Sequence, residues 1–357
     1  MVTKTAIVAI TRHGVEIARK IKQKMPEVEI YVPAKHNDGG DDVFWFTEQS
    51  TQLVGKLFKS YEALICIFSL GAVIRMVAPY LSDKKTDPAV LVIDDRANNV
   101  ISALSGHLGG ANALARLVAS FLGAQPVITT AADVNETIAV DLVGRQFNWA
   151  IDNFENVTKV SALMVNEEKI AIYQDAGESN WWQGPLPRNV TVVDNIDKIK
   201  TQEFKAGLII SDKLVHDESI LEKSVIYRPK SLVVGIGLHW DTNKQAIKSG
   251  IDKVFKENDL SFQSIRNLAS INRKANVKGI EEFCIEHSIP LEIYEKDALA
   301  SVDVPNPSPT VQRFEGTPSV SEASSLLSSK GILIVPKQKL PPNLTLAVSR
   351  IPPNHRV

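Results

Sequence analysis

Short apolar runs, each followed by a loop and an amphipathic helix, recur along this chain of 357 residues. The first run, residues 5–10, precedes a loop and a predicted helix in which Ile17, Ile21 and Met25 lie at i, i+4 and i+8. A second run, residues 64–68, precedes another loop and helix. Strands that alternate with helices favour a mainly parallel sheet covered by helices, with ligands bound beyond the carboxyl ends of the strands.

The pattern predicts an α/β fold, with mainly parallel three-layer α/β/α domains at both ends and a small α+β middle domain. We predict the amino-terminal domain at residues 1–146, the middle domain at 147–229 and the carboxy-terminal domain at 230–357. In the middle domain, residues 160–173 are interpreted as a β-hairpin. Residues 305–318 are rich in proline and are predicted to be a loop.

A glycine-rich loop around one histidine is the most distinctive motif. It consists of Ser105, Gly106, His107, Leu108, Gly109, Gly110, Ala111 and Asn112. A strand-like run, residues 100–104, precedes it, and a helix-like run, residues 113–122, follows it. Glycines let the backbone approach a ligand, and the free N–H groups of a helix start favour a carboxylate or phosphate. His107 is therefore a candidate ligand-binding residue, and the alternative of a hydrogen-bonded structural histidine stays open.

Several loops are expected to meet at the carboxyl edge of the first sheet. They are residues 11–14, 69–71, 105–110 and 129–133, and they would place His13, Arg75 and His107 on one rim. Arg75 taken alone fits a solvated helix residue at least as well. Residues 89–93 and 100–104 are predicted to form a hairpin, and a helix is predicted from residue 130 to about residue 148.

The composition excludes some classes of function. A formal net charge of −1 and a pI near 6.7 give no general attraction for nucleic acid or an anionic membrane. The longest apolar stretches are strand-sized, so we expect no membrane span, no signal peptide and a cytoplasmic protein. Cys66 and Cys284 lie in apolar runs without CxxC spacing, so we expect reduced core residues and neither a disulfide nor a zinc site.

Several motifs, in order and spacing, resemble the CbiG family of cobalt-precorrin-5A hydrolases. Those resembling its amino-terminal domain are RMVAP at 75–79, KKTDPAV at 84–90, LSGHLGGAN at 104–112 and GAQPVITTA at 123–131. Those resembling its carboxy-terminal domain, shared with CobE, are RPKSLVVGIG at 228–237, LASI at 268–271, GTPSVSEA at 316–323 and VPKQK at 335–339. The resemblance covers nearly the whole chain. Leu238 stands where many relatives have a cysteine, so a role for that cysteine does not transfer.

The resemblance implies a hydrolase of anaerobic cobalamin biosynthesis that acts on a carbon–carbon bond. Such enzymes open the δ-lactone of cobalt-precorrin-5A and expel the former bridging carbon with its methyl group as acetaldehyde, giving cobalt-precorrin-5B. Cobalt arrives inside the substrate, so the resemblance implies no separate cofactor and no protein metal site. The acetate and propionate arms of the macrocycle suit helix starts and an arginine.

We predict His107 as the catalytic residue. It would act as the general base that activates water against the lactone carbonyl, while loop N–H groups stabilise the oxyanion. The predicted substrate-binding residues are Gly71, Arg75, Ser105, Gly106, Gly109, Gly110, Asn112 and Thr130. Asp95 or Asp133 would orient the histidine, although a turn or cap role also accounts for both carboxylates.

Two other functions remain open from the sequence. One is a non-catalytic tetrapyrrole carrier or scaffold, which would release no acetaldehyde. The other is an S-adenosylmethionine-dependent methyltransferase, suggested by residues 235–237, although a fuller glycine signature is absent. We expect the domains to meet around the substrate. A homodimer and transient contacts with other cobalamin-pathway enzymes are also left open.

Overall fold

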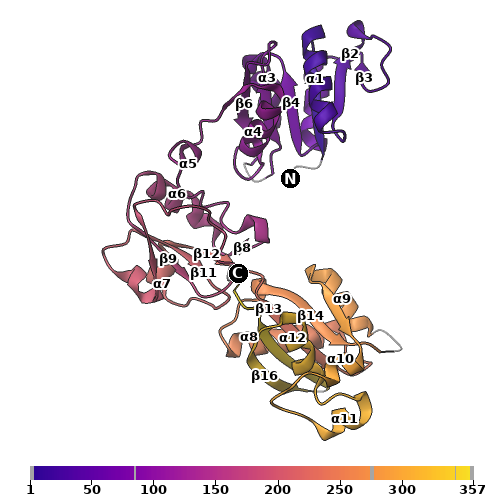
Figure 1. Cartoon of the computed structure of the whole chain (residues 1–357), viewed down its shortest axis with the longest axis vertical. Helices are drawn as coiled ribbons and strands as arrows, with labels where there is room; N and C mark the ends of the chain where they lie inside the picture. Colours follow the sequence, from indigo (N-terminus) through magenta and orange to yellow (C-terminus); the bar gives the residue numbers. More distant parts are fainter. Residues whose placement is uncertain (1–3, 84–85, 274–276, 342, 354–357) are drawn as a thin grey trace. The chain divides into compact units, whose positions relative to one another are not determined.

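The computed structural model describes residues 4–83, 86–273, 277–341 and 343–353 (Figure 1). Lys84 and Lys85, which belong to one of the motifs above, lie outside the described residues. The chain divides into two compact units, Met1–Leu142 and Val143–Val357. Among the described residues the first unit holds one sheet and the second holds two, and the predicted α/β class is confirmed. The predicted boundary between residues 229 and 230 stays a prediction.

The first unit is built on a seven-stranded sheet of order β3-β2-β1-β4-β5-β6-β7. Its strands are β1 (Thr5–Ala9), β2 (Glu29–Pro33), β3 (Phe44–Phe46), β4 (Ala63–Ile67), β5 (Ala89–Ile93), β6 (Asn99–Leu104) and β7 (Gln125–Val127). Its helices are α1 (Arg12–Lys24), α2 (Ser50–Ser60), α3 (Leu70–Val77), α4 (Ala111–Leu122) and α5 (Ala131–Val134), with 3-10 turns η1 (Ala34–His36) and η2 (Ala78–Tyr80).

Helices cover both faces of this sheet. Helices α1 and α4 pack on one face, and α2 and α3 pack on the other. Helix α1 begins after Thr11, whose Oγ accepts a hydrogen bond from the Gly14 backbone N–H at 3.0 Å. Its buried residues include Val15, Ala18 and Ile21, which lie on one helical face against the sheet. The three layers predicted for this end of the chain are present.

The direction of the sheet reverses at β6. Strands β1 to β5 run parallel, β6 runs antiparallel to β5, and β7 runs parallel to β6. The predicted hairpin is confirmed, and the Asp94 carboxylate accepts backbone N–H groups of Arg96, Asn98 and Asn99 in its turn. The helix predicted to reach residue 148 is wrong. Helix α5 ends at Val134 because Glu136 has a φ of 50°, which a continuing right-handed helix does not allow.

The second unit opens with a sheet of order β10-β9-β11-β12-β8, in which only β8 runs antiparallel to its neighbour. Its elements are β8 (Ala150–Ile151), β9 (Ile170–Gln174), β10 (Val190–Val193), β11 (Ala206–Ile210), β12 (Ser224–Arg228), α6 (Val157–Val165), α7 (Glu218–Leu221), η3 (Arg145–Phe147), η4 (Phe154–Asn156) and η5 (Ile196–Lys200). The hairpin predicted at residues 160–173 is wrong. Val157, Val160 and Met164 are buried at helical spacing on α6, where β-branched residues had suggested a strand.

The other sheet of this unit has the order β15-β14-β13-β17-β16. Its strands are β13 (Leu232–Leu238), β14 (Ile265–Ile271), β15 (Leu291–Tyr294), β16 (Ile332–Leu340) and β17 (Leu344–Arg350). Its helices are α8 (Lys244–Glu257), α9 (Lys278–His287), α10 (Lys296–Ala300), α11 (Pro309–Glu315) and α12 (Val320–Ser329), with 3-10 turn η6 (Phe262–Ser264). The proline-rich loop prediction is wrong at α11, because Ser308 caps a helix that begins at Pro309.

Buried ion pairs and hydrogen bonds join the two sheets of the second unit. Asp212, which follows β11, is fully buried, accepts Ser231 Oγ at 2.8 Å and pairs with Arg350 at the end of β17. Arg228, whose side chain is 1% exposed, pairs at 2.7 Å with Asp152 within the first of these sheets. Removing one partner from the Asp212–Arg350 pair leaves an uncompensated buried charge, so the contacts of Asp212 hold the two sheets as one compact unit.

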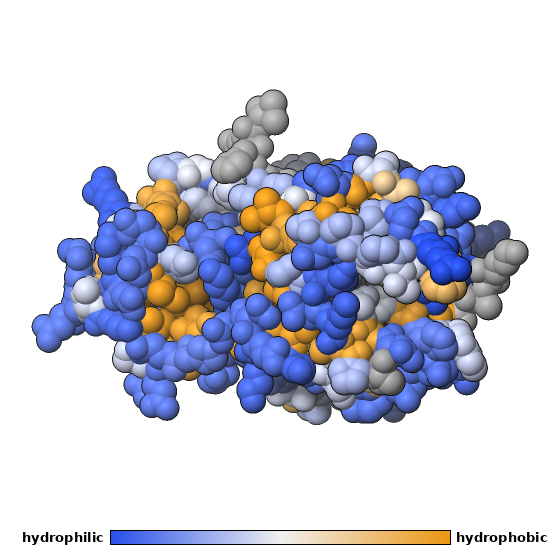
Figure 2. Space-filling model, turned by 90° about the horizontal axis from the view of Figure 1, so that it is seen from below, coloured by the Kyte–Doolittle hydropathy of each residue, from blue (hydrophilic) through white to orange (hydrophobic). Residues whose placement is uncertain are grey.

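The surface carries apolar side chains among hydrophilic ones. Figure 2 shows this from below, with orange areas separated by blue ones. In the second unit, large apolar side chains with high exposure include Trp240, Ile285, Phe314 and Ile332. Single exposed apolar residues are ordinary and need no functional explanation. Within the described ranges, no helix is long and apolar enough to cross a membrane.

Candidate functional site

The glycine-rich loop lies at the amino edge of the first sheet, not at the carboxyl edge. It follows β6, and β6 runs opposite to β1 through β5. The Ser105 Oγ donates to the carbonyl oxygen of Asp87, just before β5 begins, at 2.9 Å. Thr130, which follows β7, lies at the same edge, because β7 is parallel to β6. The predicted single rim is therefore wrong.

The carboxyl edge holds the other predicted loops. There the Asp95 carboxylate contacts Thr11 Oγ and lies 3.4 Å from His13 Nδ1. At this edge the guanidinium of Arg75 donates to the Gly71 carbonyl oxygen at 3.0 Å. The five residues of β4 separate the two edges by roughly 16 Å. Gly71 and Arg75 are thus not brought together with His107.

The backbone of the loop is tightly folded. Ser105 has a φ of 55° and Gly110 a φ of 83°, both in the left-handed region that favours glycine. A Cβ on Gly109 would lie 2.3 Å from the Ser105 Cβ. Glycine at position 109 is therefore required by this close approach.

Fewer backbone N–H groups are available to a ligand at the start of α4 than the sequence suggested. Its N–H groups are bound within the loop: Gly110 to the His107 carbonyl at 3.0 Å, Ala111 to Ser105 at 3.2 Å and Asn112 to Gly106 at 3.0 Å. These bonds satisfy donors that a helix start otherwise leaves for a ligand. The expectation that the first N–H groups of α4 are free is wrong for these three.

Asn112 organises the side chains of the site. It is 4% exposed, and its Oδ1 accepts Ser102 Oγ at 2.7 Å. Its Nδ2 donates to Thr130 Oγ at 2.9 Å and to Asp133 Oδ2 at 2.7 Å. A buried amide with this many partners is oriented firmly, so the loop after β7 is tied to the start of α4.

His107 lies between two carboxylates. Its Nδ1 is 3.1 Å from Asp141 Oδ1, and its Nε2 is 2.9 Å from Asp133 Oδ2. The hydrogen bond with Asp141 is the largest cause that raises the pKa of His107, against the opposing effect of burial. Burial acts to raise the pKa of Asp133, but hydrogen bonds from Arg116, His107 and Asn112 together lower it.

Two charged residues of this site were not predicted. Asp141 follows the turns after α5, and Arg116 donates to Asp133 Oδ1 at 2.7 Å. Arg116 lies four residues after Asn112 on α4, a spacing that places both on one helical face. Across the part of the chain that the structure describes, no group of three or more His, Cys, Asp and Glu side chains is arranged to hold a metal ion.

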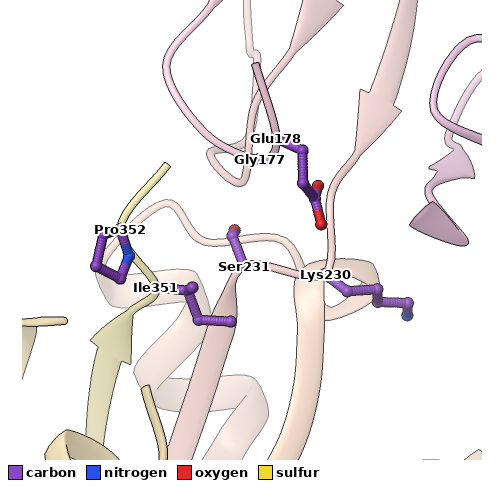
Figure 3. A pocket seen from close by; sticks show the side chains of 6 residues that line it. All are labelled: Gly177, Glu178, Lys230, Ser231, Ile351 and Pro352. Carbon is purple, nitrogen blue, oxygen red and sulfur yellow. The ribbon is translucent and has the colours of Figure 1, made fainter. Parts of the chain in front are cut away.

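Two small pockets lie among the described residues of the second unit. Figure 3 shows one, lined by Gly177, Glu178, Lys230, Ser231, Ile351 and Pro352. Its volume is about 30 Å³, enough for a water or two. Another, at the carboxyl ends of β13 and β14, is lined partly by Leu238 and Arg273 and measures about 90 Å³. Small-molecule sites usually measure about 300–1,000 Å³, so neither pocket alone accommodates a tetrapyrrole.

Models of one known protein family match most of the chain. "Cobalamin synthesis G N-terminal" matches residues 52–133, "Cobalamin biosynthesis central region" matches 138–229 and "Cobalamin synthesis G C-terminus" matches 232–349. A Priestia megaterium protein named cobalt-precorrin-5A hydrolase is 42% identical, over 97% of this chain and 95% of the relative. A protein of that name from Salmonella typhimurium strain LT2 is 29% identical, over 92% and 93%. The solved structure of a cobalamin biosynthesis protein G homolog from Sulfolobus solfataricus covers 98% of both chains at 22% identity, with a TM-score of 0.39.

The family models and the 42% identical relative define an enzyme of cobalamin biosynthesis. The chain belongs to the CbiG family, as its motifs predicted. The hydrolase function predicted from the sequence is confirmed.

Proposed function

We propose that this hydrolase opens the δ-lactone of cobalt-precorrin-5A and releases acetaldehyde, with the loop at residues 105–112 as its catalytic site. The choice of cobalt-precorrin-5A as substrate rests on the 42% identity, over 97% of the chain, to a relative named for that substrate. The observation that supports the location is the histidine held between two carboxylates at 2.9 and 3.1 Å, because paired titratable groups mark sites of proton transfer.

The proposed reaction has two steps. Water adds to the lactone carbonyl, the ring carbon–oxygen bond breaks, and the departing oxygen takes up a proton. In the second step the hydroxyl at the bridging carbon loses its proton as the carbon–carbon bond breaks. The electron pair of that bond passes to the macrocycle, and acetaldehyde leaves. Among this chain's residues, His107 is the proposed proton-transfer group, and Asn112 and Thr130 hold the loop that carries it.

We further propose that the reaction needs no cofactor beyond the cobalt in the substrate, and that the protein works in the cytoplasm. Both cysteines are free and buried, as suits a reducing compartment. Gly71 and Arg75, at the opposite edge of the sheet, are left outside the proposed site.

Acetaldehyde release from cobalt-precorrin-5A tests this proposal directly. The purified full chain should release acetaldehyde without added nucleotide, metal or S-adenosylmethionine. His107→Asn should lower kcat by about 10²–10⁴-fold, the usual contribution of a general acid or base. His13→Asn is the matched control, because that exposed histidine also faces a carboxylate but lies at the other edge. No release by the wild type would overturn the substrate, and normal turnover by His107→Asn would overturn the site.

A further inference from the structure

The two carboxylates that face His107 constrain its protonation. A neutral imidazole carries one N–H, so one ring nitrogen presents a lone pair. In this site that lone pair would face a carboxylate oxygen, either Asp141 at 3.1 Å or Asp133 at 2.9 Å. Two lone pairs at hydrogen-bond distance repel each other. The doubly protonated ring, in contrast, donates to both carboxylates.

The charges around the ring favour the same form. Asp133 from α5 and Asp141 from the turns beyond α5 both face it, and Arg116 from α4 pairs with Asp133. Within this cluster of four groups, a protonated ring gives two cations that balance two anions. With a neutral ring, the cluster keeps a net charge of −1 in a place where the His107 side chain is only 16% exposed. Burial penalises an unbalanced charge, so the balanced cluster is the more stable one.

From this geometry we infer that Asp141 is a positioning residue that holds His107 doubly protonated, so that His107 serves the hydrolase as a general acid and not as a general base. The inference rests on the proposed function and names the direction of proton transfer at that same site. It replaces the base role suggested by the sequence, since a doubly protonated ring has no lone pair with which to accept a proton.

The two ring nitrogens have different roles in this scheme. Asp133 also accepts hydrogen bonds from Arg116 at 2.7 Å and from Asn112 at 2.7 Å. These two bonds keep the carboxylate satisfied, so its hydrogen bond with Nε2 can break when substrate binds. The oxygen that leaves the lactone then takes the place of Asp133. A new O–H bond forms, the Nε2–H bond breaks, and its electron pair stays on the ring nitrogen. The Nδ1–H remains bound to Asp141, which keeps the neutral ring oriented.

Histidine NMR of the full chain tests the protonation state without substrate. With ¹⁵N-labelled histidine, the His107 signals are assigned by their absence in His107→Gln. We expect both ring nitrogens to be protonated at neutral pH. Asp141→Asn keeps an acceptor oxygen but removes the charge, so the ring should lose its second proton at lower pH than in the wild type. Glu136→Gln is the matched control, because that exposed carboxylate lies between Asp133 and Asp141 in the sequence. It should leave the titration unchanged.

The pH profile of kcat tests the direction of proton transfer. An acid is active while protonated, so kcat should fall as pH rises through the His107 titration. Asp141→Asn should shift this fall to lower pH and lower kcat about tenfold or more at high pH, the effect of one lost charged hydrogen bond, with KM changing less. A singly protonated ring at neutral pH, or a kcat that rises through the titration, would overturn the inference. If Asp141→Asn does not fold, the NMR titration and the pH profile of the wild type still test whether His107 is a doubly protonated general acid.

The two proposals fail in different ways. Absence of acetaldehyde release by the wild type would remove the proposed function while the NMR titration still reports the protonation state. A wild type that releases acetaldehyde but has a singly protonated ring would keep the function and overturn the role of Asp141.

Discussion

Gly109→Ala should destabilise the first unit through one specific clash. The new Cβ would lie 2.3 Å from the Ser105 Cβ and 2.7 Å from its carbonyl oxygen. Ser105 cannot yield easily, because its Oγ is bound to Asp87 and its carbonyl accepts the Ala111 N–H. Overpacking costs about 1–3 kcal/mol, and losing one of these hydrogen bonds costs about 1 kcal/mol more. We therefore expect the free energy of unfolding to fall by about 2–4 kcal/mol.

Scanning calorimetry of the full chain measures this effect. At about 2–4 °C per kcal/mol for a unit of this size, the melting temperature should fall by roughly 4–16 °C. Gly123→Ala is the control, because Gly123 ends the same helix with a φ of 66° and a Cβ there meets nothing within 4 Å. Gly123→Ala should lower the free energy of unfolding only by the cost of a left-handed backbone for alanine, about 1–2 kcal/mol. If Gly109→Ala melts no lower than Gly123→Ala, close approach to Ser105 is not what requires glycine at position 109.

Three further predictions concern charge and burial. Arg75→Ala should release acetaldehyde at a rate close to wild type, because its guanidinium binds the Gly71 carbonyl at the edge away from the loop; a loss like that of His107→Asn would place Arg75 in the site. The raised pKa of His107 means that its stabilising effect is complete below its unfolded value near 6.5 and is lost as pH rises through the folded value. In urea titrations the stability gap between wild type and His107→Gln should therefore shrink with rising pH, and a gap that widens would contradict this. Burial raises the pKa of Cys66 to about 12 and that of Cys284 to about 11, so neither thiol should react with Ellman's reagent at pH 8 before unfolding, and fast reaction in the native protein would refute this.

The layered fold was predictable because apolar periodicity is a local property of the sequence. Residues 5–10 contain β1, residues 64–68 overlap β4 in all but its first residue, and helices follow both. The position of the glycine-rich loop was predicted wrongly, although the sequence held the needed signal. A hairpin at residues 89–104 reverses the chain, so the loop after its second strand must leave at the opposite edge of the sheet.

Of the two carboxylates beside His107, the sequence pointed only to Asp133, as an alternative to Asp95, and Asp141 was not predicted. Asp133 and Asp141 lie 26 and 34 residues further along the chain, beyond α4 and β7. The approach of Asp141 depends on how the turns after α5 fold back, and no periodic pattern encodes that path. Asn112 and Arg116 were accessible to sequence reasoning, because their spacing of four on a helix places both on one face.

Strand β13 lies at the centre of its sheet, yet the ribosome supplies its two neighbours at very different times. Strand β14 begins at Ile265, whereas β17 begins at Leu344, which is 344 minus 238, or 106, residues after the end of β13. At synthesis rates of about 5–20 residues per second, one side of β13 stays unpaired for about 5–20 s. An open edge of an apolar strand pairs readily with other chains. The nascent protein should therefore need chaperone protection most during this interval, until β17 closes the edge.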